Sequence, residues 1–365
     1  MTLENKALAK TDDFPIKHEG NIHNGKVRSV YWLTDNDSDR LIQQKAYDIP
    51  LETKLGVMII SDRISAFDCI WQGEEDLEGI PGKGASLNAI SNYWFSQFNI
   101  KGLAGNHIID TPHPLVWIVK KAQPIMVEAI ARDYITGSMW RDYEKGIRKF
   151  GGITFPDGLK ANQKLSELLI TPSTKGIMKG ILGIPEEEDV NITREQIEAN
   201  HEAFGFRHIE DVDRYEHLLL EGFDLIREEL RKIDELFVDT KFEFGYANDR
   251  EGRIEMIYID EIGTPDSSRM WNAQSYERGK IIENSKEGFR QYLLNTLERD
   301  VFINKGRMEE RKQLAINYRV PVDEMMKVSK TYMDIAEKIT GKPIKLSERP
   351  REEILDSLAS LGILN

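Results

Sequence analysis

Charged and uncharged side chains alternate over residues 238–244, so that Asp239, Lys241 and Glu243 share one side of an extended chain. The other side carries Val238, Thr240, Phe242 and Phe244. A further acid, Asp260, follows the apolar run at residues 257–259. Acids grouped around a lysine suit a divalent cation bound together with phosphates, because carboxylate oxygens replace water ligands and the ammonium offsets phosphate charge. A solvated strand face of ion pairs is the alternative.

The polar run at residues 248–252 predicts a hairpin turn that brings Asp260 back toward this strand. With the turn centred near Asp249 and Arg250, Asp260 lies beside Asp239. A slip of one residue moves it to the opposite face, because side chains alternate with a period of two. The register of the hairpin therefore decides which acids share a site.

Two loops and a turn carry other candidate residues. Asp62 and Ser65 lie in SDRISAFD directly after an apolar run, and loops at strand ends often hold ligand groups. Arg132 stands near the end of another predicted strand, before Ser138, and Arg269 ends the run PDSSR. A guanidinium fork binds phosphate or carboxylate through two parallel hydrogen bonds, which lysine cannot do. Turn formers joined by salt bridges are the alternative for each loop.

Two glycine–lysine segments are candidates for anion binding. Lys26 and Arg28 lie in GKVR, which opens a predicted strand, and IPGKG at residues 80–84 precedes a helix whose first amides favour anions. Both segments are equally compatible with structural turns. The sequence contains no GxxxxGK[ST], no GxGxxG after a strand, no HExxH and no GxSxG. The common nucleotide-binding loops and the zinc-protease and serine-hydrolase motifs are therefore missing.

Composition limits the classes of protein to consider. The chain has 365 residues, 40% hydrophobic and 30% charged, which is typical of a globular protein with two or three domains. A formal net charge of -13 argues against broad nucleic-acid binding, which needs a basic surface. Any phosphate-binding site must therefore be a small region of positive charge on a negatively charged protein. The one cysteine, Cys69, has no partner for a disulfide. With no apolar leader in residues 1–6 and no apolar window of membrane-spanning length, we expect a cytoplasmic protein without a membrane contact.

The first third of the chain is predicted to be rich in strands. Short apolar runs at residues 26–33, 55–61 and 115–120 are typical of strands, and a helical period after IPGKG predicts a helix beginning near Ser86. The segment 121–124 ends in proline and indicates an extended connector, suitable as a hinge between lobes. A strand at 125–131, a loop-rich stretch at 151–185 and a long amphipathic helix over 209–233 follow.

Beyond about residue 286 the pattern is helical throughout. One helix is predicted to stop at Gly341 and Pro343, and a last helix to run from Pro350 to Gly362. The expected organisation is a β-rich lobe at 1–122, an α+β lobe at 123–290 and a helical extension at 291–365.

Seven blocks of this sequence, in order, resemble the signature blocks of the phosphoribosylaminoimidazole-succinocarboxamide synthase (SAICAR synthetase) family. They are GKVRSVY, SDRISAFD, IPGKGASLNAISNYWF, VEAIARDYITGS, TPSTKG, DTKFEFG and IDEIGTPDSSRMW. The resemblance implies an ATP-dependent ligase that joins L-aspartate to the carboxylate of carboxyaminoimidazole ribonucleotide, through an acyl phosphate, with Mg²⁺. It also implies a two-lobed α+β fold related to ATP-grasp enzymes and kinases.

The same resemblance assigns roles to individual residues. Lys26 and Arg28 approach the ATP phosphates, and Lys120 or Lys121 lies near the nucleotide at the hinge. Glu243 and Asp260 hold the metal–nucleotide complex. Asp239, Lys241 and Arg269 act on the ribonucleotide by position and charge. The remaining substrate residues are Arg132, Ser138, Lys175 and Ser268 for the ribonucleotide, and Asp62 and Ser65 for L-aspartate.

The sequence departs from the family pattern in two places. A longer run follows Lys175, with residues 188–193 as the nearest equivalent of an acidic family element, which leaves the role of Asp189 open. The helical tail extends past the matched blocks and either caps the second lobe or forms a contact in a homo-oligomer. Two other functions stay open: a kinase-like enzyme acting on another carboxylate or hydroxyl, and a catalytically silent nucleotide-binding protein.

Overall fold

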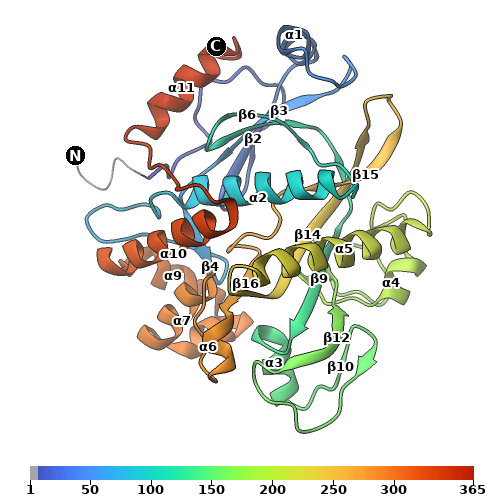
Figure 1. Ribbon diagram of the computed structural model, residues 1–365, viewed down its shortest axis with the longest axis vertical. Coiled ribbons are helices and arrows are strands. Elements are labelled where there is room, and N and C mark those ends of the chain that lie inside the picture. The colour runs from blue at the N-terminus through green and yellow to red at the C-terminus, as the bar shows by residue number, and fades with distance from the viewer. Residues whose placement is uncertain (1–6) are drawn as a thin grey trace.

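Five antiparallel strands form the first sheet, in the order β1–β2–β3–β7–β6 (Figure 1). They are β1 (His23–Asn24), β2 (Arg28–Trp32), β3 (Leu55–Ile60), β6 (Ile108–His113) and β7 (Val116–Lys120). The positions of β2, β3 and β7 confirm three predicted strands. Helix α1 (Asp35–Lys45) packs on this sheet, and buried Tyr31, Leu41 and Val57 lie in their common core. The computed structural model describes residues 7–365, so residues 1–6, where no apolar leader was found, lie outside it.

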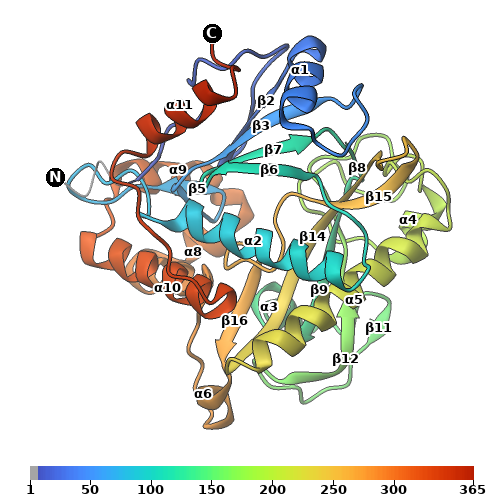
Figure 2. The same cartoon turned by 45° about the horizontal axis from the view of Figure 1, so that its top comes forward.

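Helix α2 (Lys83–Ile100) crosses the middle of the molecule, beneath the first sheet in Figure 2. It begins three residues before the predicted start at Ser86, because the apolar period cannot detect a first turn that carries Lys83 and a glycine. Gly82 caps the helix with a φ of 80°, a left-handed conformation that glycine adopts without strain. The buried side of α2 also reaches the second core, where Phe98 lies 4.9 Å from Tyr258 between ring centroids.

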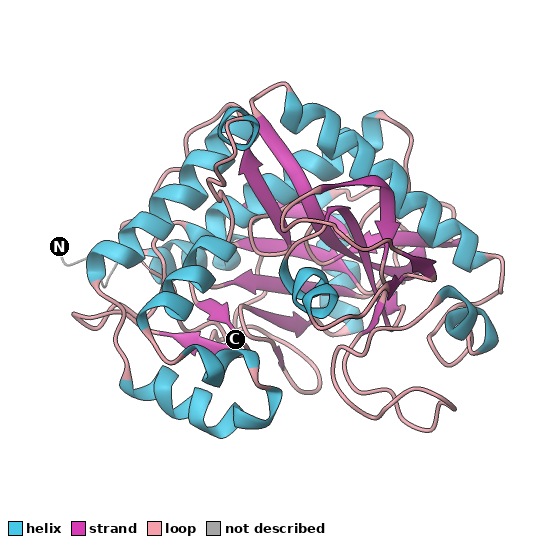
Figure 3. Cartoon of the chain, turned by 90° about the horizontal axis from the view of Figure 1, so that it is seen from below, coloured by secondary structure: helices cyan, strands magenta, loops and turns pink. Residues whose placement is uncertain are grey.

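The second sheet is built around one long central strand, β14 (Glu235–Asn248). β14 pairs with β9 (Val127–Tyr134), β15 (Ile254–Ile259), β16 (Ser268–Asn272) and β8 (Gln123–Pro124). Helix α5 (Asp211–Arg231) confirms the predicted long helix and covers one face, where Phe223 lies 4.7 Å from Phe237. Seen from below, the strands run through the centre of the molecule with helices around them (Figure 3).

The hairpin register differs from the expected one. Asn248 pairs with Ile254 and Glu243 with Ile259, so the turn is centred on Glu251. The Asp249 carboxylate explains this wider turn, because it accepts hydrogen bonds from the amides of Glu251 and Arg253, at 2.8 and 2.9 Å. The expectation that Asp260 lies beside Asp239 is therefore wrong: Asp260 follows Ile259 and stands near Glu243.

A second difference lies at Val238, which was expected on the same face as Phe242. The pairing of β14 with β16 shifts between Phe237 and Asp239, as at a β-bulge. Val238 packs in a small cluster with Tyr134 and Trp271 instead.

Between α3 (Gly137–Glu144) and α5, short elements replace much of the expected loop. They are β10 (Lys149–Phe150), β11 (Ile153–Thr154), β12 (Lys164–Ile170), β13 (Ser173–Thr174) and α4 (Arg194–Ala199). β12 is an edge strand on β9 that the sequence analysis did not detect. Its burial is irregular along the strand, so no clear alternation marks it.

Beyond residue 286 the chain is helical, as predicted, with α7 (Glu287–Thr296), α8 (Arg299–Ile303), α9 (Met308–Asn317), α10 (Val322–Thr340) and α11 (Pro350–Ser360). The short helix α6 (Ala273–Glu277) precedes this region. Gly341 caps α10 and Pro350 opens α11, both as expected. Helices α7 to α10 cover the small hairpin of β4 (Ile64–Ala66) and β5 (Cys69–Trp71), where buried Phe302 packs on Trp71. Within residues 7–365 no helix has the length and apolarity of a bilayer crossing.

The end of the chain returns to its beginning. Leu364 forms an antiparallel bridge with Ile16, and the amide of Lys17 donates to the carbonyl of Ile363 at 2.8 Å. Buried Leu358 in α11 lies in the same core as Phe14. The core of the first sheet therefore contains both the earliest and the last described segments.

The change Phe223→Ala tests the core under the second sheet. We expect a loss of about 3–5 kcal/mol in the free energy of unfolding, because truncation of a fully buried aromatic ring leaves a cavity. Urea unfolding followed by tryptophan fluorescence measures it. Ile100→Ala, at a side chain that is 73% exposed, is the control and should change stability by less than about 0.5 kcal/mol. Equal losses in the two variants would contradict this packing.

Candidate active site

The charged face of β14 is held together by ion pairs with neighbouring strands. Asp239 Oδ2 accepts hydrogen bonds from Arg132 Nη1 at 3.2 Å and from Arg269 Nη1 at 2.5 Å. Arg132 comes from β9 and Arg269 from β16, the two strands that flank this part of β14. Two guanidinium groups therefore share this carboxylate, and a guanidinium fork is suited to binding an anion through two hydrogen bonds.

Arg269 is fixed on its other side as well. Its Nη2 donates to Glu287 at 3.1 Å, and the backbone of Gly137 lies so close that a Cβ there would be 2.5 Å from Nη2. Gly137 also has a φ of 58°, so glycine is required for both reasons. Burial by itself lowers the pKa of Arg269, but Asp239 and Glu287 raise it above its usual value. The guanidinium stays charged.

Lys241 lies between two carboxylates. Its Nζ is 2.9 Å from Glu128 and 2.7 Å from Glu243, and Lys175 pairs with the second oxygen of Glu243. Burial opposes the charge on Lys241, but Glu128 and Asp260 outweigh it and raise its pKa. Burial lowers the pKa of Lys175. This part of the face therefore combines two ammonium groups with several acids, whereas the strand pattern indicated only one lysine, Lys241, among them.

Asp260 stands just past the end of β15 with a φ of 60°. Arg28, from β2 of the first sheet, contacts Asp260 at 3.1 Å and Glu261 at 2.8 Å. Burial alone raises the pKa of Asp260, but Arg28, Lys241 and Lys175 lower it, so the carboxylate is ionised. The ion pair of Arg28 with Asp260 thus joins the two sheets at one of the two predicted metal ligands.

The other predicted lysines lie at two further places. Lys26 pairs with Asp68 at 2.5 Å, and both side chains are about half exposed. Lys120 donates to the carbonyl of Asn248 at 2.8 Å, and Lys121 lies over the Trp32 ring, 5.4 Å from its centroid. Lys120 and Lys121 line a pocket of about 180 Å³ with residues that the sequence analysis missed: Lys54, Gln123, Arg207 and Tyr246.

Asp62 has no free oxygen for a ligand. Its two carboxylate oxygens accept the amides of Leu8 and Gly84, both at 2.8 Å, and the side chain is buried. Burial raises the pKa of Asp62 to about 6, against the effect of these two donors. Asp62 therefore ties the SDRISAFD loop to the first turn of α2. Ser65 is half-buried in β4.

The two remaining predicted serines differ in exposure. Ser138 is exposed in the first turn of α3, close in sequence to the guanidinium pair. Ser268 is buried and its Oγ bonds to Thr240 Oγ1 at 2.8 Å. Asp189, whose role the sequence left open, is exposed with a φ of 53°.

Polar atoms without partners lie between the two sheets. Neither ring nitrogen of His107, nor Nε of Arg28, nor Nε1 of Trp117 has a hydrogen-bond partner, although all are buried. The His107 and Trp117 rings are 5.8 Å apart, and Arg28 lies 5.7 Å from the Trp117 centroid. Buried donors normally have partners, so this group is an exception among the buried polar atoms. It was missed because isolated His and Trp residues give no motif.

A magnesium ion fits this donor set only together with a ligand. Within residues 7–365 no three His, Cys, Asp or Glu side chains are grouped as a metal site. Glu243 and Asp260 share the cations Lys241 and Lys175, which places two carboxylates near one another. Mg²⁺ is commonly held by one or two carboxylates plus substrate phosphates, so the pair is sufficient when phosphates supply the other oxygens.

Known proteins of one family are similar to this chain over most of its length. Residues 21–301 match SAICAR synthetase. The chain belongs to the SAICAR synthetase family. The phosphoribosylaminoimidazole-succinocarboxamide synthase of Shewanella amazonensis is 61% identical over 356 residues, which cover 97% of each chain.

Solved SAICAR synthetases share the α+β fold. The SAICAR synthase of Saccharomyces cerevisiae complexed with SAICAR is 26% identical, with a TM-score of 0.62 over 90% of this chain and 99% of that one. A type 2 SAICAR synthetase in complex with ADP is 19% identical, with a TM-score of 0.56 over 89% of this chain and 100% of that one. The predicted family and the α+β class are confirmed, and the relation to ATP-grasp enzymes stays a prediction.

Acid titration tests the environment of His107. Burial, with Arg28 and Lys120 adding to it against Asp260, lowers the pKa of His107 to about 4. An unfolded histidine titrates near 6.5, so the unfolded state binds more protons between these values and stability falls as the pH is lowered from 6.5 to 4, by up to about 3 kcal/mol. Thermal unfolding across this range should show a smaller loss in His107→Phe than in the wild type. His23→Gln, at an exposed histidine, should follow the wild type.

Proposed function

We propose that this chain catalyses the ATP-dependent joining of L-aspartate to the carboxylate of carboxyaminoimidazole ribonucleotide, giving SAICAR, ADP and phosphate in purine biosynthesis. Near-full-length identity of 61% to a phosphoribosylaminoimidazole-succinocarboxamide synthase supports this reaction most strongly. The site chemistry agrees with it, because a carboxylate is a poor electrophile and needs activation among several anionic ligands. Such a site requires fixed cations, and β14 and its neighbours supply them.

The guanidinium pair is proposed to hold the ribonucleotide phosphate. Arg132 and Arg269 share Asp239, and Arg269 and Arg290 share Glu287. Three guanidinium groups thus face two carboxylates, so an incoming phosphate meets an excess of positive charge. Ser138, exposed at the start of α3, adds a hydroxyl donor beside them. In this assignment Asp239 fixes both guanidinium groups and Ser268 supports the strand that carries Arg269.

Lys241, Lys175 and the acids beside them are proposed to lie where the phosphoryl group meets the carboxylate. The γ-phosphoryl group converts this carboxylate to an acyl phosphate, which the aspartate amine then attacks with release of phosphate. Mg²⁺, when bound, offsets the charge of the nucleotide phosphates, with Glu243 and Asp260 as its protein ligands. Lys241 keeps its proton and stabilises negative charge by position.

ATP is proposed to lie between the sheets, from the pocket of Lys120 and Lys121 toward Asp260. The unpartnered donors of His107 and Trp117 lie on this route. Lys26 is well suited to a phosphate because its present partner, Asp68, is exposed and easily replaced. Arg28 is already paired with Asp260 and Glu261, so we assign it to holding these acids. A relation to ATP-grasp enzymes would agree with a nucleotide held between two sheets.

L-Aspartate is proposed to bind near the SDRISAFD loop. Ser65 is the candidate that remains there, since both oxygens of Asp62 are taken by backbone amides. Asp62 then acts by shaping the loop.

Omitting each substrate in turn tests the reaction. Purified protein should release ADP only when ATP, Mg²⁺, the ribonucleotide and L-aspartate are all present, because the phosphoryl group is transferred to a carboxylate that the amine then captures. A coupled assay for ADP measures it. Full ATP turnover without aspartate would favour a kinase-like enzyme, and ATP binding without any product would favour a silent nucleotide-binding protein.

Gly137→Ala tests the guanidinium pair. A methyl group would lie 2.5 Å from Arg269 Nη2, so Arg269 must move, and we expect KM for the ribonucleotide to rise by about 10-fold or more. Gly20→Ala is the matched control: its φ is 65° and no atom lies within 4 Å of the added carbon. Both changes introduce left-handed strain of about 1 kcal/mol, so similar losses of stability with different KM values would support the assignment. Equal KM values would contradict it.

A further inference from the structure

Asp266, in the turn before β16, connects three distant segments. Its Oδ1 accepts the hydroxyl of Tyr332 in α10 at 2.5 Å, and its Oδ2 accepts Lys83 Nζ of α2 at 2.9 Å. Lys286, directly before α7, lies 3.4 Å from the same oxygen. The side chains of Lys83 and Tyr332 are completely buried and that of Asp266 is 4% exposed. A buried carboxylate with three fixed partners defines one position for its backbone.

Hydrogen bonds within the turn connect Asp266 to the residues of the candidate site. The amides of Asp266 and Ser267 both donate to Thr264 Oγ1 at 3.3 Å, and the amide of Ser268 donates to the Thr264 carbonyl at 2.9 Å. The Ser267 carbonyl in turn accepts the amide of Lys241 at 3.1 Å. Arg269 follows two residues later. Because these bonds close a tight turn, a shift of Asp266 moves Ser268 and Arg269 with it.

We infer that helices α7 and α10 position the ribonucleotide-binding end of β16, with Tyr332 as a positioning residue that acts through Asp266. The inference rests on the function proposed above. Tyr332 lies beyond residues 21–301, which the family model covers, and beyond the last sequence block that carried the resemblance. The helical extension is thereby a working part of the site.

A second contact from the same helices acts on Arg269 directly. Glu287, the first residue of α7, accepts Arg269 Nη2, and the amide of Lys286 donates to the Pro265 carbonyl at 2.9 Å. The start of α7 is thus bonded to both ends of the turn. α10 also reaches α2, because Ser329 Oγ donates to the Pro81 carbonyl at 2.6 Å.

Charge states favour this arrangement. Burial by itself raises the pKa of Asp266, but Lys286 and Lys83 lower it well below its usual value, so the carboxylate is ionised. Burial and the Asp266 charge raise the pKa of Tyr332 far above its usual value. The phenol therefore stays protonated and donates a hydrogen bond to the ionised carboxylate.

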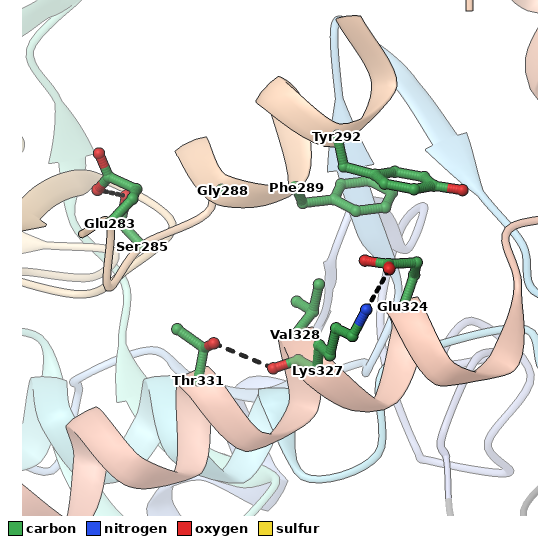
Figure 4. A pocket seen from close by; sticks show the side chains of 9 residues that line it. All are labelled: Glu283, Ser285, Gly288, Phe289, Tyr292, Glu324, Lys327, Val328 and Thr331. Atoms are coloured by element: carbon green, nitrogen blue, oxygen red, sulfur yellow. Dashed lines mark hydrogen bonds and ion pairs between the residues drawn. The ribbon is translucent and has the colours of Figure 1, made fainter. Parts of the chain in front are cut away.

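A pocket lies between α7 and α10. It has a volume of about 170 Å³ and is lined by Phe289 and Tyr292 of α7 and by Val328 of α10 (Figure 4). Lys327 bonds to Glu324 of its own helix, and Thr331 Oγ1 donates to the Lys327 carbonyl.

Tyr332→Phe tests the inference, since it removes one hydroxyl and keeps the ring that lies over Lys83. We expect KM for the ribonucleotide to rise by about 10-fold, the effect of losing a hydrogen bond to a charged group, while KM for ATP changes by less than about 2-fold. Steady-state kinetics with each substrate varied measures both values. A purely structural role would change both KM values together.

Tyr292→Phe is the matched control. It removes a hydroxyl from the pair of Tyr292 and Tyr318, which are 2.6 Å apart in the same group of helices and away from Asp266. Both KM values should stay at the wild-type level. An unchanged ribonucleotide KM in Tyr332→Phe, or an equal rise in both KM values, would overturn the inference.

Glu287→Gln gives a second test should Tyr332→Phe accumulate poorly, because it keeps an acceptor for Arg269 but removes the charge. The ribonucleotide KM should again rise alone, and its constancy would count against the inference. Assays of the wild-type enzyme distinguish a failure of the proposed function from a failure of this inference. If it forms no product from the full substrate set, the proposed function fails; if it does and the variants behave as wild type, only the role of the helices fails.

Discussion

Mutual neutralisation of buried charges along β14 is the constraint on which the site depends. An ion that leaves water without a partner loses several kcal/mol, so every charged side chain on this face must meet one of opposite sign. Asp239 lies between two guanidinium groups, and Lys241 lies between Glu128 and Glu243. Only a central strand, paired on both sides over its length, can supply such partners from both directions. The strand order therefore determines which charged side chains meet at the site.

Ligands reach this face by exchanging partners. Lys175 already pairs with Glu243, and Arg28 with Asp260 and Glu261. A phosphate or a metal ion that enters must replace some of these contacts, so the free energy of binding is the difference between two well-paired states. Arg28 comes from the first sheet, and Asp260 and Glu261 follow a strand of the second sheet. Replacing these contacts would therefore change how the two sheets are joined.

Local patterns in the sequence predicted much of the fold and part of the site. Alternation at residues 239–243 correctly assigned the charged face, because the period of a strand is a local property. The hairpin register was not predictable, since it depends on which amides the Asp249 side chain selects. The role of Asp62 was hidden for a similar reason: both of its partners are backbone amides that no motif reveals. The bonds at Asp266 join residues 183 and 66 positions apart, so only the folded chain could show them.

The pairing of Ile16 with Leu364 has a bearing on how the molecule is made. The first sheet cannot complete its apolar core until α11 has left the ribosome, because Leu358 and Ile363 fill the same cluster as Phe14. During synthesis this core therefore stays incomplete after every strand of the second sheet has been made. The closeness of these segments also means that a short linker could join them, which would permit new chain ends to be opened in an exposed loop elsewhere.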